Sequence, residues 1–432
     1  MCHIVTPSVT NAQIYLARKR MYAFSIDLIW IYFMSTTPIA APPLLSPQRL
    51  AVSLMFLANG FVVGNWAPKI PEFAARLNLD ESDLGLMIMC FGIGSLCAMP
   101  AVGAMIAGRG SHAVTRIIAA LTIPCLIFVT IAPSIWTAAL ALFVIGALIG
   151  GMDVAMNANA VEVEKRQGRA IMSSCHGCWS LGGVAGAGLG GLLIALYGVH
   201  VHAVIASVLT GIAVAIAWPR VLVDPPHILA SEAGQPVTSA SRPSLLGAGA
   251  AVWLTGIICL IMMTPEGAIL DWGALYLRQE LGADPALSGL AFGAFSAAMA
   301  LMRFLGDLVR DRFGAVRTFR VSCVLAMAGL GIAGLASTPE LAIAGFAIAG
   351  LGFANTVPIA FSAAGNLPGL PQGLAISVVT FMGYSGILFA PSVIGFIAEH
   401  TGFAAVYLAL PVFVIMPLAF SKMMRHADRQ PG

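Results

Sequence analysis

Four ionisable side chains lie inside long apolar stretches of the sequence, where a charge is hard to keep. They are Asp153, Glu266, Asp271 and Arg303. If these stretches cross a bilayer, a charge near the centre costs at least about 2.5 to 3.5 kcal/mol, so each residue is a candidate for function. A buried carboxyl group can also take up a proton when its hydration changes. Proton uptake and the binding of a polar solute are therefore the chemistry that these residues indicate.

Asp153 belongs to a stripe of residues with helical spacing. Gly146, Gly150, Asp153 and Asn157 follow one another at intervals of 4, 3 and 4 residues, which places them on one helix face. A groove of small residues would then lead to a carboxylate and an amide, which can hold hydroxyl or amine groups. The alternative is a buried aspartate that only bonds a neighbouring helix.

Pro265-Glu266-Gly267 places an acid between two helix-breaking residues. Transporters bind substrate where helices are interrupted near mid-membrane, so Glu266 is the first candidate for a proton-coupling carboxylate. Asp271 lies about 140° around an ideal helix from Glu266, so the two acids share a cavity only if the helix is broken. Next to Trp272, Asp271 is equally well explained as an interfacial residue beside an aromatic anchor.

Five further side chains are candidates for lining the same cavity: His176, Trp179, Asn59, Trp66 and Asn355. Histidine titrates near neutral pH without help, so it could relay protons or bond a hydroxyl group, while a tryptophan offers a stacking face. Asn59 and Trp66 are seven residues apart and share one helix face. For the histidine, packing without function is an equally good explanation.

The composition decides the class of protein. Of 432 residues, 59% are hydrophobic and 9% are charged, against about 25% charged in soluble proteins. The mean hydropathy is +0.91. This is a polytopic membrane protein with the lipid bilayer as its surroundings. A net charge of +3 spread along the chain offers no face for nucleic acid. The sequence shows no ATP-binding loop, metal-ligand cluster or activated nucleophile, so we expect no enzyme, metal or cofactor.

Twelve apolar stretches are long enough to cross a bilayer, which takes about 20 residues each. The predicted spans are 49–67, 84–107, 114–132, 136–158, 173–197, 201–219, 247–276, 285–306, 318–336, 340–361, 373–397 and 403–421. With a cytoplasmic N-terminus, 18 lysines and arginines fall in inside segments and three in outside loops. The positive-inside rule then places both termini in the cytoplasm.

The spans divide the chain into two halves. The proline-rich stretch from Val221 to Ser244 indicates a linker, and Gly103–Arg109 has a counterpart in Gly306–Arg312. We predict an all-α membrane protein of two six-helix bundles. Its segments would be a cytoplasmic extension (1–48), a first bundle (49–220), a cytoplasmic linker (221–246), a second bundle (247–422) and a cytoplasmic tail (423–432).

These features resemble the major facilitator superfamily, over residues 49 to 422. The loop sequence Gly306–Gly314 is similar to the superfamily signature between spans eight and nine. Four segments resemble a bacterial subgroup of sugar-permease-like inner-membrane proteins: Asn59–Pro71, Gly151–Asn159, Ser174–Gly183 and Glu266–Trp272. That subgroup is similar to the fucose permease branch and to a membrane protein proposed to move rhizopine, an inositol amine. The fucose permease branch also has a carboxylate in span one. Here that span has no acid, and Asn59 is the nearest polar group.

The resemblance also implies a cytoplasmic latch that holds the two halves together. Arg303, Asp307 and Asp311 are spaced i, i+4 and i+8, so Arg303 can pair with Asp307 along the helix, and Arg312 stands beside them. The alternative is a charge cluster that merely flanks a span. The glycine-rich segment Gly182–Gly191 is similar to a signature of antiporter branches, although close helix packing also explains it.

We therefore predict a secondary active transporter in the bacterial inner membrane, driven by protons. Its cargo would be a small polar organic solute, such as a sugar, polyol or amino-sugar derivative, and we expect it to act as a monomer. The alternatives are an exporter of amphiphilic compounds by proton antiport and a membrane sensor that does not transport.

Overall fold

The computed structural model describes residues 46–79, 81–224, 249–283, 285–368 and 370–428. The predicted N-terminal extension and the predicted linker fall almost entirely outside these residues. The predicted segment boundaries therefore stay predictions. Residues from Pro47 onward form one compact unit.

Every regular element in the described ranges is a helix. In chain order the elements are α2 (Pro47–Trp66), η1 (Ala67–Lys69), α3 (Ile70–Leu77), α4 (Glu81–Arg109), α5 (Ser111–Thr122), α6 (Cys125–Ile131), α7 (Ile135–Gln167), α8 (Met172–Ala217), η2 (Trp218–Arg220), α10 (Ala250–Gln279), α11 (Pro285–Phe313), α12 (Ala315–Gly334), α13 (Pro339–Phe353), α14 (Thr356–Gly365), α15 (Gln372–Thr401), α16 (Phe403–Ala419) and η4 (Ser421–Ala427).

The predicted all-α membrane fold is confirmed. Nine helices among the described residues are long and apolar enough to cross a membrane, and the bent pair of α16 and η4 makes a tenth. One of the nine, Met172–Arg220, contains two crossings, because Gly198 turns the chain at φ 76°. Together with α2, these helices correspond to the twelve predicted spans.

The two halves repeat the same backbone features at a constant spacing. Gly110 and Gly314, 204 positions apart, both precede a helix with φ 79° and nearly the same ψ. Gly198 and Gly402 are also 204 apart and share a positive φ. A side chain at φ values near 80° would be strained, which explains why glycine stands at all four turns. The internal repeat that the sequence indicated only faintly is therefore visible in the backbone.

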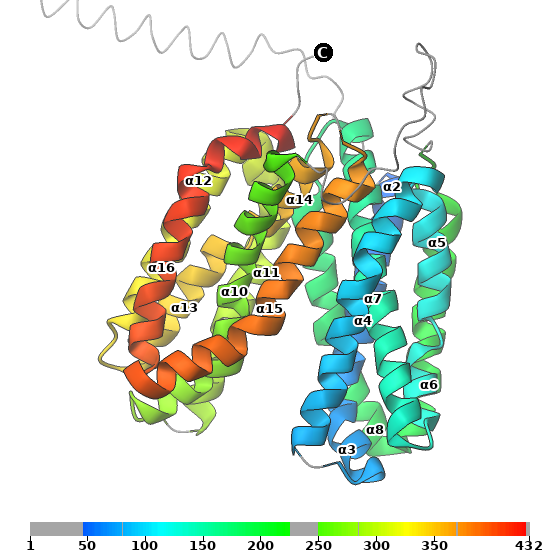
Figure 1. The fold of residues 1–432 in the computed structure, drawn as a ribbon, viewed down its shortest axis with the longest axis horizontal. Coiled ribbons are helices and arrows are strands. Elements are labelled where there is room, and N and C mark those ends of the chain that lie inside the picture. Colours follow the sequence, from blue (N-terminus) through cyan, green and yellow to red (C-terminus); the bar gives the residue numbers. More distant parts are fainter. Residues whose placement is uncertain (1–45, 80, 225–248, 284, 369, 429–432) are drawn as a thin grey trace, which may run out of the picture. The chain divides into compact units, whose positions relative to one another are not determined.

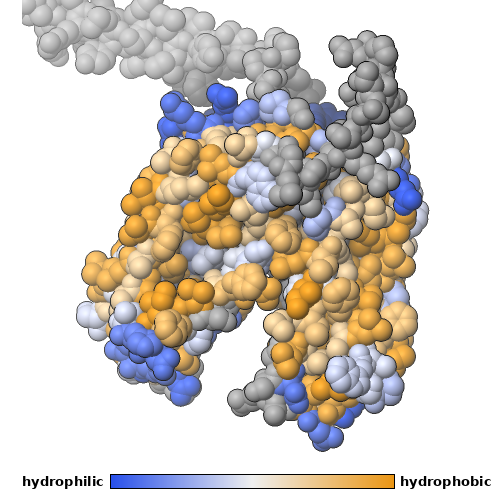
Figure 2. Space-filling model, in the orientation of Figure 1, coloured by the Kyte–Doolittle hydropathy of each residue, from blue (hydrophilic) through white to orange (hydrophobic). Residues whose placement is uncertain are grey.

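The two groups of helices, α2–α8 and α10–α16, meet at one end and separate at the other (Figure 1). We call these the closed end, where α4, α11 and η4 terminate, and the open end, where α3 and α6 lie. Figure 2 shows the resulting cleft between the two groups at the open end. Such a cleft gives water and solutes a path from one side of the protein only.

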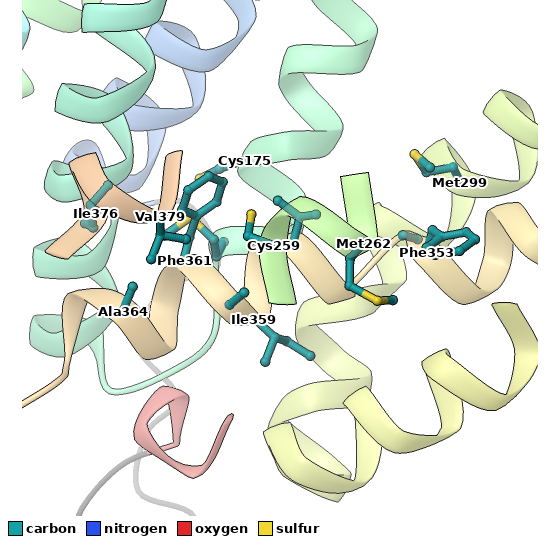
Figure 3. Close-up of a cluster of buried hydrophobic side chains, with 14 of the residues drawn as sticks. Cys175, Cys259, Met262, Met299, Phe353, Ile359, Phe361, Ala364, Ile376 and Val379 are labelled. Atoms are coloured by element: carbon teal, nitrogen blue, oxygen red, sulfur yellow. The ribbon is translucent and has the colours of Figure 1, made fainter. Parts of the chain in front are cut away.

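Two glycines bring the groups together near the closed end. A Cβ atom on Gly103 would lie 2.6 Å from the Ser377 Cβ of α15, and one on Gly306 would lie 2.9 Å from the Ser173 Cβ of α8. Apolar side chains pack across the same region. Cys175 of α8 lies in one buried cluster with Cys259 of α10 and other side chains of the second group (Figure 3). The closed end is thus sealed by close helix packing.

Candidate functional site

Asp153, Asn157 and His176 form a chain of polar contacts between α7 and α8. The Asn157 Nδ2 donates to the Asp153 main-chain oxygen at 2.8 Å and lies 3.3 Å from its Oδ1. The His176 Nε2 lies 3.2 Å from the Asn157 Oδ1, so a proton on Nε2 would complete the chain. Asp153 and Asn157 are buried. The arrangement can hold a proton or bond a polar group that replaces one of these partners.

His176 also meets the second half of the protein. Its ring is stacked on Phe361 of α14 with centroids 5.7 Å apart, and it is tilted against Phe56 of α2 at 5.2 Å. The polar chain from Asp153 therefore ends at the contact between the two halves. A movement of one half against the other would change the surroundings of His176.

Arg303 and Glu266 are the charged groups that the second half contributes. The Arg303 Nη2 lies 3.7 Å from the Glu266 Oε2, and the Arg303 Nη1 donates to the Ser180 Oγ of α8 at 2.8 Å. The Arg303 side chain is 8% exposed and that of Glu266 is 32% exposed. The Arg303 Nε is buried without a hydrogen-bond partner in the described structure. Arg303 thus links α11 to α10 and α8, while Glu266 is partly exposed.

The predicted interruption at Glu266 is wrong. α10 runs without a break from Ala250 to Gln279, with Pro265 inside it. Because the helix is continuous, Glu266 and Asp271 keep their separation around its axis, and Asp271 is exposed. Asp271 therefore does not join Glu266, which is consistent with the interfacial alternative.

Tyr384 of α15 completes the set, and the sequence had not singled it out. It lies close enough to Asp153 and to Glu266 for both charges to act on it. His176 and Arg303 are likewise within electrostatic reach of each other. Groups from both halves therefore share one site. No spacing along the chain could indicate Tyr384, because it is brought in by packing of α15 against α10.

Asn59 and Trp66 lie in different places. The Asn59 Oδ1 accepts from the Trp179 Nε1 at 2.9 Å, and its Nδ2 donates to the Ile149 main-chain oxygen at 3.2 Å. Asn59 therefore orients Trp179, and both its side-chain oxygen and its side-chain nitrogen are hydrogen-bonded. Trp66, at the end of α2, packs edge-on against Phe73 at 5.2 Å. It lies toward the open end and away from the polar site.

Asn355 stands at a break in the chain between α13 and α14. It is fully buried, and neither its Oδ1 nor its Nδ2 has a hydrogen-bond partner among the described atoms. The discontinuous helix that the sequence predicted at Glu266 is thus found here.

The acids of the predicted latch hold the start of α8. The Asp307 carboxylate accepts from the Ser173 and Ser174 main-chain N–H groups at 2.9 and 3.1 Å and lies 3.5 Å from the Arg49 Nη2. Asp311 accepts from the Ala170 N–H at 2.8 Å. A carboxylate at a helix N-terminus is stabilised by the helix dipole. Two acids of α11 therefore bind the first half at the closed end.

The arginines of the closed end differ from the prediction. None of the ion pairs in the described ranges joins Arg303 to Asp307, and Arg312 is exposed with its guanidinium 5.8 Å from the Phe313 ring centroid. Arg310 makes the buried contact instead. Its Nη1 lies 2.6 Å from the Glu164 Oε1, and its Nη2 meets the Ala427 main-chain oxygen. Arg310 is seven residues from Arg303, so helical spacing could have indicated it.

Comparison with known proteins decides the family. A model described as Major Facilitator Superfamily matches residues 52–276 and 267–431. The chain belongs to the major facilitator superfamily. It is a membrane transporter and not an enzyme, as predicted, because this is a superfamily of transporters.

Relatives within the superfamily match over most of their length. An uncharacterized MFS-type transporter of Yersinia pestis is 34% identical over 87% of this chain and 95% of its own. The membrane protein MosC of Rhizobium meliloti is 31% identical over 88% of this chain and 91% of its own. A crystal structure of FucP in the outward conformation covers 88% of this chain and 99% of its own, at 17% identity and a TM-score of 0.67, and supports the fold.

Proposed function

We propose that this protein is a proton-coupled secondary transporter that moves a small polar organic solute by alternating access. One observation carries the proposal: Arg303, which pairs with Glu266 in the second half, donates to Ser180 of the first half and lies within electrostatic reach of His176, while the cleft is open at one end and closed at the other. A site between two movable bundles is the arrangement that alternating access requires.

The basic residues support an orientation for the open cleft. Arg109, Arg166, Arg312 and Arg425 lie at or near the closed end, and all are exposed. By the positive-inside rule this end would face the cytoplasm of a bacterial inner membrane, with both termini on that side. The cleft would then face outward.

The polar groups favour a solute with hydroxyl or amine groups, such as a sugar, a polyol or an amino-sugar derivative. Asp153 and Asn157 can accept and donate hydrogen bonds, and the partly exposed Trp179 offers a ring face held in place by Asn59. Likeness in fold to FucP, described as a fucose:proton symporter, supports the same solute class and the coupling to protons.

Packing accounts for the glycines of α8 without any export role. Cβ atoms on Gly182 and Gly186 would lie 2.2 and 2.4 Å from main-chain oxygens of α2. These glycines therefore allow α2 and α8 to touch. The similarity to antiporter branches is therefore explained by packing and does not indicate export.

Counterflow in proteoliposomes tests whether the protein carries such solutes. Vesicles loaded with one unlabelled sugar, inositol or amino sugar are diluted into the labelled compound. We expect exchange for at least one member of the panel in wild type, and a loss for Asp153→Asn. Asp271→Asn is the matched control, because it makes the same chemical change on an exposed side chain. Binding of a solute without exchange would identify a sensor and refute the proposal.

A further inference from the structure

Arg303 stands between two carboxylates that belong to different parts of the mechanism. It lies 3.7 Å from Glu266 of α10, and Asp307 follows it by one turn of α11. Side chains at i and i+4 are neighbours on a helix, about 5–6 Å apart at their Cβ atoms. Arg303 can therefore reach Asp307 by a change of side-chain conformation, although in this structure it is turned to Glu266.

Only one of the two acids is partly exposed in this state. The side chain of Glu266 is 32% exposed, whereas those of Arg303 and Asp307 are 8% and 7% exposed. A proton entering from the open end thus meets Glu266 first. Protonation would leave Arg303 as a buried cation with the Ser180 hydroxyl group as its hydrogen-bond partner. A buried charge that loses its counter-ion is strongly destabilised.

We propose that Arg303 is a positioning residue that exchanges Glu266 for Asp307 when Glu266 takes up a proton, and that this exchange releases α8 from α11. The inference rests on the proposed proton coupling and adds the route by which the site signals to the closed end. The Asp307 carboxylate now accepts from the Ser173 and Ser174 N–H groups. A guanidinium at Asp307 would neutralise the charge that stabilises this helix N-terminus.

The other charged and titratable groups around these residues do not replace Arg303 in this role. Tyr384 is within electrostatic reach of Glu266, and His176 of Arg303. Arg49, Glu164, Cys175 and Cys178 are within electrostatic reach of Asp307. Arg49 already pairs with Asp307 while the end is closed, at 3.5 Å. Protonation of Glu266 therefore adds one new contact, in which Arg303 pairs with Asp307. Asp307 then has a second cation beside it, which competes with the Ser173 and Ser174 N–H groups for the carboxylate.

A distance measurement at the closed end follows the release directly. Spin labels can be attached through a ketone-bearing amino acid at Gly108, where an added side chain meets open space, and at the exposed Lys422, so that the native cysteines stay. Wild type should show a longer closed-end distance at acidic than at alkaline pH, without any solute. Glu266→Gln mimics the protonated acid and should favour the open form at every pH, by a factor of about 5 to 150.

The order of the three residues gives the decisive comparison. At alkaline pH, Arg303→Gln should keep the end closed, and the double variant Glu266→Gln/Arg303→Gln should be closed as well. Arg303→Gln/Asp307→Asn should be open, because Asp307 acts after Arg303. A double variant of Glu266 and Arg303 that opens like Glu266→Gln alone would overturn the proposal, since Glu266 would then act without Arg303.

Two further measurements keep the test valid if Arg303→Gln does not fold. Arg303→Lys keeps the charge and should retain a pH-dependent distance, and a wild-type distance that does not change with pH would overturn the proposal by itself. Because no solute is present, the result is independent of the counterflow test. If no solute is exchanged in counterflow but the variants open and close as predicted, only the proposed function is refuted. If a solute is exchanged but the variants do not behave as predicted, only the proposed role of Arg303 is refuted.

Discussion

The buried pair of Glu164 and Arg310 should control how often the closed end opens. Their side chains are 7% and 6% exposed, and the Arg310 Nη1 lies 2.6 Å from the Glu164 Oε1. Glu164 also accepts from the Ser362 hydroxyl at 2.6 Å and from the Ile171 N–H at 3.1 Å. The pair joins α7 of the first half to α11 and α14 of the second, so it must separate when the halves part at this end.

Replacing Glu164 by glutamine keeps the shape and removes the charge. Loss of one partner of a buried pair costs about 3–5 kcal/mol. We expect the lower end of this range, because glutamine can still accept from Ile171. In the open form solvent would screen the pair, so the substitution should destabilise the closed form and leave the open form nearly unchanged. With about 1.4 kcal/mol for each factor of ten, the ratio of open to closed molecules should rise about 100-fold.

The closed-end distance between labels at Gly108 and Lys422 measures this ratio. Glu162→Gln is the matched control, two residues away. Glu162 pairs with Lys165 at 2.8 Å, but the Lys165 side chain is 38% exposed. A helix-surface pair of this kind contributes about 0.3–0.5 kcal/mol, so the control should hardly move the distribution. The reasoning would be refuted if Glu164→Gln and Glu162→Gln changed the closed-end distance equally. It would also be refuted if Glu164→Gln lowered the melting temperature but left the closed-end distance unchanged.

Three further predictions concern stability. Gly60→Ala should destabilise the fold by about 1–3 kcal/mol and lower the thermal unfolding midpoint, because the added Cβ would lie 2.0 Å from the Trp179 main-chain oxygen. Gly188→Ala is the control and should leave the midpoint unchanged, because a Cβ there meets open space. Asn355→Ala should raise the midpoint, since it removes a buried amide without partners; a lower midpoint would show that the amide is bonded. Burial lowers the pKa of Lys69 from 10.5 to about 8, so the folded form binds this proton less tightly than the unfolded form. Stability should then rise as the pH increases from about 8 toward 10.5, and Lys69→Met should abolish this rise in midpoint.

The parts of the fold that depend on local sequence could be predicted. Apolar length alone placed the twelve spans, and the i, i+4 spacing of Asp153 and Asn157 placed them on one helix face, where the structure has them in contact. The partner of Arg303 could not be predicted in this way. Asp307 and Glu266 are both within its reach, and the choice depends on how α10 packs against α11. The same is true of Tyr384, which joins the site from a distant part of the chain.

The location of the helix break shows a second limit. Proline removes one helical hydrogen bond and crowds the carbonyl four residues before it. Pro358 fits this explanation, because the chain is broken at Ala354 and Asn355. Pro265 has the same chemistry, yet α10 continues through it. A proline therefore predicts a possible break, and the packing of the neighbouring helices decides which one forms.

Solute accumulation driven by an imposed pH difference tests the central claim most directly. In proteoliposomes that are alkaline inside, wild type should concentrate an exchanged solute on one side of the membrane: inside if the solute travels with protons, and outside if it travels against them. Glu266→Gln should exchange the solute but not concentrate it. Wild type that only equilibrates the solute, or Glu266→Gln that concentrates it as well as wild type does, would contradict proton coupling through this site.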